Sequence, residues 1–185
     1  MTKTAAPMTS GSIWKQMTFF AMPIFLGNLF QQLYNTVDSL IVGNFLGSSA
    51  LAAVSSSGSL IFMLIGFLSG ISAGAGVIVA RFFGAGDEKN LQRAVHTTVA
   101  FGLVAGVLMT GVGVALSPQI LRWMDTPESV MRESVTYLQI YFAGSLGFVM
   151  YNVLVGILQA VGDSRHPLYY LILSSLVNIA LDLLF

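Results

Sequence analysis

The sequence lacks cysteine altogether, and only 9% of its 185 residues are charged. The first absence excludes disulfides, zinc–thiolate centres and catalysis by a thiol. The second excludes a soluble enzyme, because an average soluble domain carries about 25% charged residues. Eight basic and eight acidic residues cancel, so no basic patch remains for nucleic acid, and we expect no such partner.

Long apolar runs dominate the sequence instead. Hydrophobic residues make up 55% of the chain, and the mean hydropathy is +0.80. A membrane helix needs roughly 20 apolar residues, and five stretches qualify, the last still apolar at Phe185. We therefore predict an all-α, polytopic membrane helix bundle, with a cytoplasmic N-terminus at 1–16 and a transmembrane lobe at 17–185. The predicted spans are 17–45, 51–80, 94–116, 135–161 and 168–185.

Smaller features refine this bundle. Between the third and fourth spans, Pro118 and Thr126-Pro127 are expected to break the helix, with a short surface helix after Pro127 capped by Thr126. Glycines recur every four residues in two spans, which predicts faces where helices pack closely. These glycines are Gly66, Gly70 and Gly74 in the second span, and Gly102 and Gly106 in the third.

The basic residues predict an orientation. With the N-terminus inside, six basic residues face the cytoplasm and two, Arg122 and Arg132, face outward, as the positive-inside rule requires. The six are Lys3, Lys15, Arg81, Lys89, Arg93 and Arg165. We expect a multi-pass protein of the cytoplasmic membrane. The fifth span would end inside the bilayer with unpaired carbonyls, so we also expect a piece of a longer protein.

Two acidic residues lie within the spans, Asp38 and Asp182, and no basic residue accompanies them there. A carboxylate at membrane depth is costly and is a functional candidate by default. Asp38 continues a helical stripe of Asn28, Gln31 and Asn35, which cannot face lipid. These three residues, with Tyr34 on the flank, are candidates to line a cavity.

The fifth span repeats this arrangement, because Asn178 lies one turn before Asp182. Helix rise places Asp182 about 21 Å from the inner end of its span and Asp38 about 10 Å from the outer end of its own. Both fall in the outer half of the bilayer, where they and Asn178 could form one cation-coupling site. The site could exchange a proton or hold sodium. Pro23, in the same span as Asp38, is a candidate hinge.

No cofactor and no enzymatic activity are expected. The Gly84-Ala-Gly-Asp87 motif has the form used by intramembrane aspartyl proteases, but Asp87 lies in a charged loop. Asp38 and Asp182 could form an aspartyl pair, yet nothing in the sequence supplies a gate for a substrate helix.

Several stretches together resemble one family of transporters. They are Gln32-Leu-Tyr-Asn-Thr-Val-Asp-Ser-Leu-Ile-Val-Gly43 with Leu51-Ala-Ala-Val54, Phe83-Gly-Ala-Gly-Asp87, Leu158-Gln-Ala-Val-Gly-Asp-Ser164 and Asn178-Ile-Ala-Leu-Asp182. They are similar to multidrug and toxic compound extrusion (MATE) transporters, in particular the prokaryotic branch of the DinF proteins. The resemblance implies twelve helices in two six-helix lobes, of which this chain would be five helices of the N-terminal lobe. The missing C-terminal lobe would be its partner.

The resemblance also implies a function and a site. Family members export lipophilic, mostly cationic drugs and toxic compounds in exchange for protons or sodium. In the DinF-like branch an acidic residue of the first helix and an Asn and Asp of the fifth form the coupling site, which correspond to Asp38, Asn178 and Asp182; the first-helix proline corresponds to Pro23. The alternative is a flippase for lipid-linked oligosaccharides or related lipids, which carries cationic residues in its cavity; these spans contain none.

Overall fold

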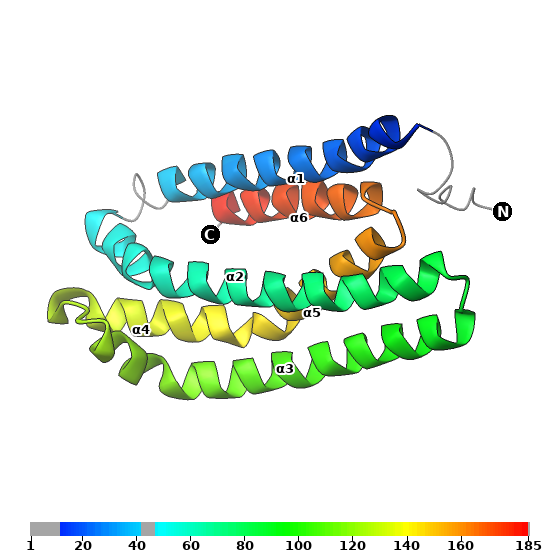
Figure 1. Cartoon of the computed structure of the whole chain (residues 1–185). Coiled ribbons are helices and arrows are strands. Elements are labelled where there is room, and N and C mark those ends of the chain that lie inside the picture. Colours follow the sequence, from blue (N-terminus) through cyan, green and yellow to red (C-terminus); the bar gives the residue numbers. More distant parts are fainter. Residues whose placement is uncertain (1–11, 42–46, 185) are drawn as a thin grey trace.

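A computed structural model describes residues 12–41 and 47–184, and these residues form six helices with no strand between them (Figure 1). The helices are α1 (Ile13–Ile41), α2 (Gly47–Gly84), α3 (Glu88–Trp123), α4 (Glu128–Ala143), α5 (Ser145–Ala160) and α6 (Arg165–Leu184). The predicted all-α bundle is therefore confirmed. The residues between α1 and α2 lie outside the described ranges.

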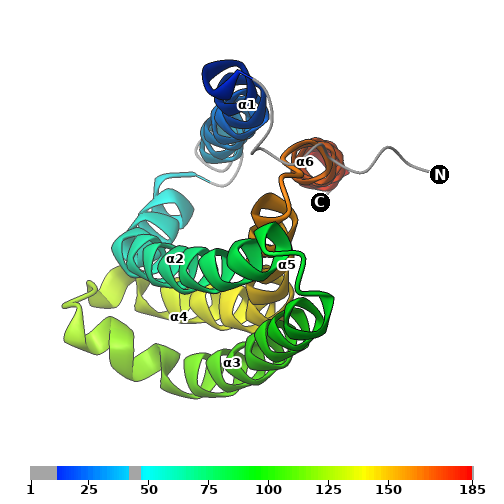
Figure 2. The ribbon, with the colours of Figure 1, turned by 45° about the vertical axis from the view of Figure 1, so that its right-hand side comes forward.

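The helices form two groups. α3 packs against α4 and α5, and α2 packs against all three of them. α1 packs against α6, and this pair lies over the face of α2 and α5 (Figure 2). α1 and α6 run in the same direction (Figure 1). Few contacts join the two groups, and those recorded lie between α5 and α6.

The fourth predicted span is two helices, not one. α4 ends at Ala143 and α5 begins at Ser145, with a bend of 46° between them. Gly144 stands at the break, where its N–H donates to the carbonyls of Ile140 and Tyr141. The sequence from 135 to 161 is mostly apolar on both sides of Gly144, so the apolar pattern carries no trace of the bend.

The prediction that Pro118 ends the third span was wrong, because α3 continues through it to Trp123. Proline has no N–H, so the carbonyl of Val114, four residues earlier, loses its helical donor. Gln139 of α4 replaces that donor, with its Nε2 3.4 Å from the Val114 oxygen. The surface helix capped by Thr126 is also absent: α4 starts as a long helix after Pro127, and no side chain caps it.

Close helix packing occurs at some of the predicted glycines. A Cβ added to Gly102 would lie 2.9 Å from Val153, and one added to Gly106 would lie 2.7 Å from Leu146. These glycines let α3 approach α5 closely, as predicted. Gly66, Gly70 and Gly74 of α2, by contrast, approach no other described helix within 4 Å.

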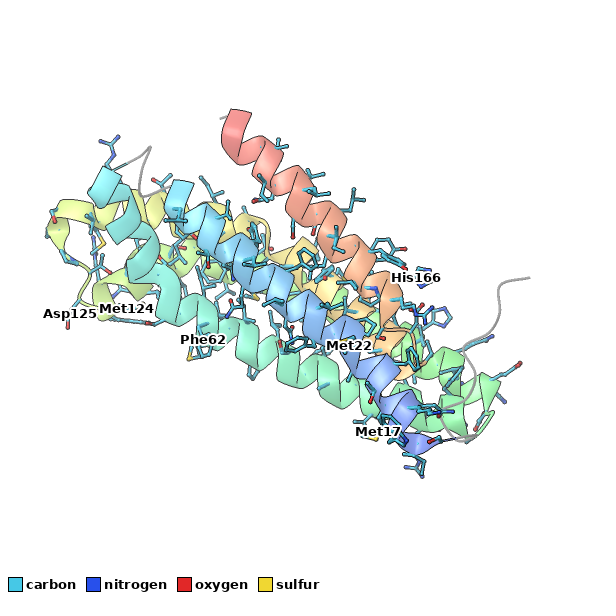
Figure 3. All side chains as sticks on the ribbon, turned by 90° about the horizontal axis from the view of Figure 1, so that it is seen from above. Met17, Met22, Phe62, Met124, Asp125 and His166 are labelled. Atoms are coloured by element: carbon cyan, nitrogen blue, oxygen red, sulfur yellow. The ribbon has the colours of Figure 1, made fainter. Side chains whose placement is uncertain are left out.

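The bundle carries a large apolar surface. Two stretches among the described residues, Ser57–Gly84 and Glu88–Trp123, are long and apolar enough to cross a membrane, and the bent pair of α4 and α5 adds a third if it is one span. Met17, Met22 and Phe62 are at least half exposed on the outer surfaces of α1 and α2 (Figure 3). Such a surface suits lipid or further protein rather than water.

Candidate functional site

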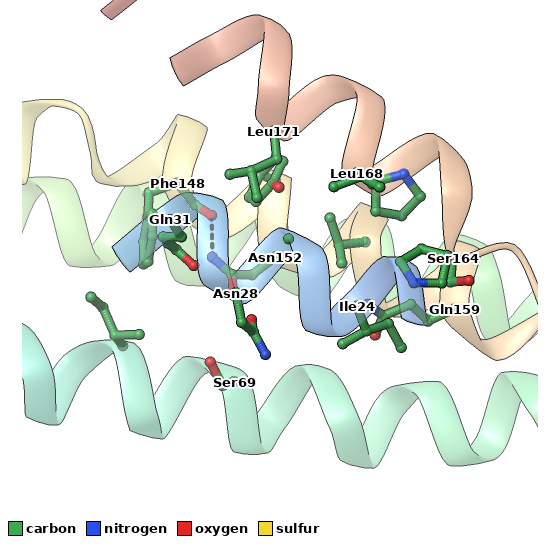
Figure 4. Close-up of a pocket in the computed structure, with 16 residues that line it drawn as sticks. Ile24, Asn28, Gln31, Ser69, Phe148, Asn152, Gln159, Ser164, Leu168 and Leu171 are labelled. Carbon is green, nitrogen blue, oxygen red and sulfur yellow. Dashed lines mark hydrogen bonds between the residues drawn. The ribbon is translucent and has the colours of Figure 1, made fainter. Parts of the chain in front are cut away.

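A cavity of about 200 Å³ lies between the two groups of helices, with walls from α1, α2, α5 and α6 (Figure 4). A larger and more open cavity of about 570 Å³ adjoins it toward α2. The two share residues of three helices, so they form one continuous space. The shared residues are Ile24, Asn28, Ser69, Asn152, Val155 and Gln159.

The cavity walls are largely apolar but include a set of neutral polar groups and carry no formal charge. Amide, hydroxyl and phenol groups come from Asn28, Gln31, Ser69, Ser72, Tyr151, Asn152, Gln159 and Ser164. Among the described residues that line the two cavities, none is basic or acidic. The space therefore offers hydrogen-bonding oxygens and amides without a fixed counter-ion.

Asn152 shows how the helices hold these groups. Its Nδ2 donates to the carbonyl of Phe148, one turn earlier, at 2.9 Å. The backbone carbonyl of Asn152 accepts a hydrogen bond of 2.6 Å from Ser72 Oγ of α2. Gly156 permits this approach, because a Cβ there would lie 2.5 Å from the same Ser72 oxygen. α2 and α5 thus fix the floor of the cavity.

The structure places the four predicted cavity-lining residues differently. Asn28 and Gln31 both line the cavity. Tyr34 and Asn35 do not line either described cavity; Asn35 Nδ2 lies 3.5 Å from Gln32 Oε1 on the same helix. Pro23 also lines the cavity, within a continuous α1. Its role as a hinge stays a prediction.

Several lining residues were missed by the sequence analysis, notably Tyr151, Asn152 and Gln159 of α5. Asn152 and Gln159 are seven residues apart and so share a helix face. That spacing is the same kind of signal that identified the stripe on the first span. On α5 the signal is weak, because only two amides share the face and the rest of the stretch is apolar.

The predicted coupling residues lie on the two neighbouring helices α1 and α6. These helices touch at Gly27, where an added Cβ would lie 3.4 Å from Leu171. Asp38 and Asp182 each come eleven residues after one of these contact positions, and the helices are parallel. The side chains of both acids lie outside the described part of the structure. The coupling site stays a prediction.

Asn178 is the coupling candidate whose side chain is described. It is half-buried on α6, and its Oδ1 is buried without a hydrogen-bond partner among the described residues. A buried amide oxygen without a donor costs free energy, about 1–3 kcal/mol. An oxygen in this state is a suitable ligand for a cation.

The turn before α6 lies at one end of the cavity. The Asp163 carboxylate accepts the backbone N–H groups of Arg165 and His166, at 3.1 and 3.2 Å, and contacts the His166 ring. Burial opposes ionisation of Asp163, but these hydrogen bonds and the nearby His166 outweigh it and lower the pKa of the carboxyl. The turn holds the buried Ser164 and Pro167 against the cavity.

Long apolar helices around an uncharged cavity that is lined by apolar side chains and a few neutral polar groups are the architecture of a multi-pass membrane transporter. The chain belongs to the MatE family, which it matches over residues 23–184. The predicted MATE resemblance is thereby confirmed.

Among curated relatives, the chain is 38% identical over 170 residues to the probable multidrug resistance protein YoeA of Bacillus subtilis. The match covers 92% of this chain and 37% of YoeA. It is 26% identical over 173 residues to the DNA damage-inducible protein F of Escherichia coli, covering 91% of this chain and 37% of that protein. The chain thus spans well under half the length of these relatives.

Solved structures of transporters agree with this family assignment. The chain superimposes with a TM-score of 0.88 and 27% identity on a MOP superfamily transporter from Pyrococcus furiosus, for which the reverse polarity of the binding pocket suggests a different function. It superimposes with a TM-score of 0.87 and 26% identity on an outward-facing multidrug resistance MATE transporter. Each match covers 97% of this chain and 40% of the other.

Proposed function

We propose that the complete protein exports lipophilic, mostly cationic compounds across the cytoplasmic membrane in exchange for protons or sodium. The 185 residues supply one lobe of this antiporter, and a C-terminal lobe of the same protein supplies the rest. The family membership and the multidrug resistance relatives support this proposal.

The observation that carries the proposal is the cavity between α1, α2, α5 and α6. Its neutral oxygens and amides, with the phenol of Tyr151, can accept a weakly hydrated organic cation without a strong competing charge. A flippase for lipid phosphates would need basic groups there. No described residue that lines the cavities is basic, so the exporter is the better match.

The coupling ion binds, in this proposal, at Asp38, Asn178 and Asp182. The buried Asn178 Oδ1, which accepts no hydrogen bond, supports a cation ligand at this position. Two carboxyls near one another in an apolar medium cannot both stay ionised without a cation, so one takes a proton or the pair holds sodium. Binding the ion favours one conformation of the lobe and lowers its affinity for the exported compound.

The test measures efflux of a fluorescent lipophilic cation in everted vesicles that contain the complete protein. A proton gradient or a sodium gradient is imposed, and the wild type is compared with Asp38→Asn and Asp182→Asn. We expect transport to depend on one of the gradients and to be lost in both variants. Glu133→Gln is the matched control, because Glu133 is an exposed acid at the start of α4.

Full gradient-driven efflux in Asp38→Asn would contradict the coupling site. Absence of efflux in the wild type under both gradients, together with binding of a lipid pyrophosphate, would contradict the exporter and favour the flippase. The Glu133→Gln control separates loss of a coupling carboxyl from a general effect of removing an acidic charge.

A further inference from the structure

The charges of the described residues divide unequally between the two ends of the bundle. One end is formed where α1, α3 and α6 begin and α2 ends (Figure 1). We call this the basic end, defined by the five exposed residues Lys15, Arg81, Lys89, Arg93 and Arg165. Met17 and His166 mark it in Figure 3, and Met124 and Asp125 mark the other end.

The cations of the basic end are not used by the fold. Among the described residues, the one ion pair joins His166 to Asp163 and involves no lysine or arginine. Two of the three acids at this end are engaged as helix caps: Asp87 accepts from Asn90 of α3, and Asp163 accepts from the first residues of α6. Asp87 attracts Arg93 electrostatically. Among the described residues the side chains of Lys15, Arg81 and Arg165 form no ion pair, and Arg165 contacts Asp163 through its backbone N–H.

The opposite end has the reverse balance. Arg122 and Arg132 stand there against three exposed acids, Asp125, Glu128 and Glu133. A surface with more acids than bases has no electrostatic reason to prefer an anionic ligand. The opposite end therefore serves as a control for anion binding at the basic end.

Aromatic side chains place the basic end at the boundary of the bilayer. Trp14, Tyr169 and Tyr170 are each more than half exposed, and they lie beside Lys15 and one turn after Arg165. Tryptophan and tyrosine favour the level of the lipid headgroups. Immediately inside the basic end, Ile78 of α2 is also more than half exposed and lines neither cavity, as a residue that faces acyl chains would.

We propose that the basic end binds the headgroups of anionic phospholipids, with Lys15, Arg81 and Arg165 as the principal contacts. These residues belong to α1, α2 and α6, and Arg81 and Arg165 directly follow the cavity-lining Ala80 and Ser164. Headgroup phosphates at these cations bridge the two groups of helices at the inner mouth of the cavity. Each basic residue near an anionic surface contributes about a fivefold gain in affinity.

The two tryptophans of the chain make this proposal measurable, because Trp14 lies at the basic end and Trp123 ends α3 at the other. The complete protein is reconstituted in brominated phosphatidylcholine, which quenches tryptophan, in a background where Trp14 or Trp123 is the remaining tryptophan. Unbrominated phosphatidylglycerol or phosphatidylcholine is then added. We expect phosphatidylglycerol to restore Trp14 fluorescence at lower mole fraction than phosphatidylcholine does, and the two lipids to act equally at Trp123.

Two variants locate the effect. The triple variant Lys15→Gln, Arg81→Gln and Arg165→Gln is expected to lower the preference for phosphatidylglycerol at Trp14 by up to about a hundredfold. The matched variant Arg122→Gln and Arg132→Gln is expected to leave that preference unchanged. Raising the salt concentration to about 1 M, where the Debye length is about 3 Å, should also remove it.

Equal restoration of Trp14 fluorescence by both lipids in the wild type would overturn the proposal. A preference that persists in the triple variant, or that the matched variant also loses, would overturn it as well. The outcome is independent of drug efflux, since lipid preference is measured without a gradient or an exported compound.

Discussion

At the scale of single residues, a side chain of one helix supplies a hydrogen bond that a proline removes from another helix. Pro118 leaves the Val114 carbonyl without a helical donor inside a mostly apolar bundle, and Gln139 reaches across from α4 to supply one. An unsatisfied carbonyl is costlier in a membrane than in water, because no solvent can replace the missing donor. Because α3 contains Pro118, the bundle needs the Gln139 amide as a hydrogen-bond donor to the Val114 carbonyl.

Replacing Gln139 tests this dependence. Gln139→Met keeps the length of the side chain but removes the donor, and we expect a loss of about 1 kcal/mol in the free energy of unfolding. In a Pro118→Ala background the same replacement should cost nearly nothing, because the new N–H bonds to the Val114 carbonyl. Thermal unfolding in detergent measures both. Equal losses in the two backgrounds would show that Gln139 acts in some other way.

Asp163 gives a prediction about pH. Its pKa is lowered from 3.8 in the folded protein, so its contribution to stability is full above that ordinary value and is lost as the pH falls through the lowered pKa. We expect Asp163→Ala to lower the free energy of unfolding by about 1 kcal/mol at pH 7, as removal of a helix cap does. The difference from the wild type should shrink as the pH falls below 3.8.

Unfolding measured between pH 7 and pH 3 checks this expectation, with Asp163→Asn as the control. The asparagine retains an oxygen that accepts the two N–H groups but carries no charge, so its deficit should be smaller than that of Asp163→Ala. A deficit of Asp163→Ala that stays constant down to pH 3 would contradict the role of the carboxylate.

At the scale of the helices, α3 is the element that organises the larger group. It packs along α4 and α5 and against α2. Three of its glycines are buried at the face toward α4 and α5: Gly102, Gly106 and Gly113. A fourth, Gly111, has no atom within 4 Å of the position where a Cβ would stand. α3 thus contains glycines at close helix contacts and a glycine without such a contact. Comparing substitutions at the two positions separates the effect of close packing from that of helix propensity.

Alanine substitutions should separate the two kinds. In Gly106→Ala the new Cβ would lie 2.7 Å from Leu146 Cδ1 and 3.1 Å from its Cα, so α3 and α5 must move apart, at a cost of about 1–3 kcal/mol. Gly111→Ala should be neutral or stabilise by up to about 1 kcal/mol, through helix propensity. Thermal unfolding of both variants in the same detergent is the measurement, and an equal effect at the two positions would contradict the packing argument.

The elements show what the sequence can and cannot predict. Runs of apolar residues locate the helices, because the bilayer demands them, and the polar stripe of α1 contains Asn28 and Gln31, which the structure places at the cavity. The break at Gly144 stays hidden, since it changes direction without changing hydropathy. Pro118 misleads because its missing donor is replaced by Gln139, a partner distant in sequence. Asn152 and Gln159 are recognised as cavity-lining residues only when α5 is placed against α1 and α2.

At the scale of the whole molecule, two groups of helices enclose a cavity, and α1 and α6 touch the larger group sparsely. Much of the surface of α1 and α6 is apolar and exposed, including Phe25, Leu29 and Leu173. The chain spans 36% to 41% of the lengths of the relatives and structures it matches. In the complete protein these exposed faces are where we expect the remaining helices to pack.

The orientation of the bundle follows from the same charges that define the basic end. The positive-inside rule assigns this end to the cytoplasm, so the start of α3 should face inward and the start of α4 outward. The 185 residues contain no cysteine, so Lys89→Cys and Glu128→Cys each introduce a single thiol into them. A membrane-impermeant maleimide should label Glu128→Cys in intact cells and Lys89→Cys in everted vesicles. Labelling of Lys89→Cys from outside intact cells would invert the assignment, and with it the side from which the cavity receives its substrate.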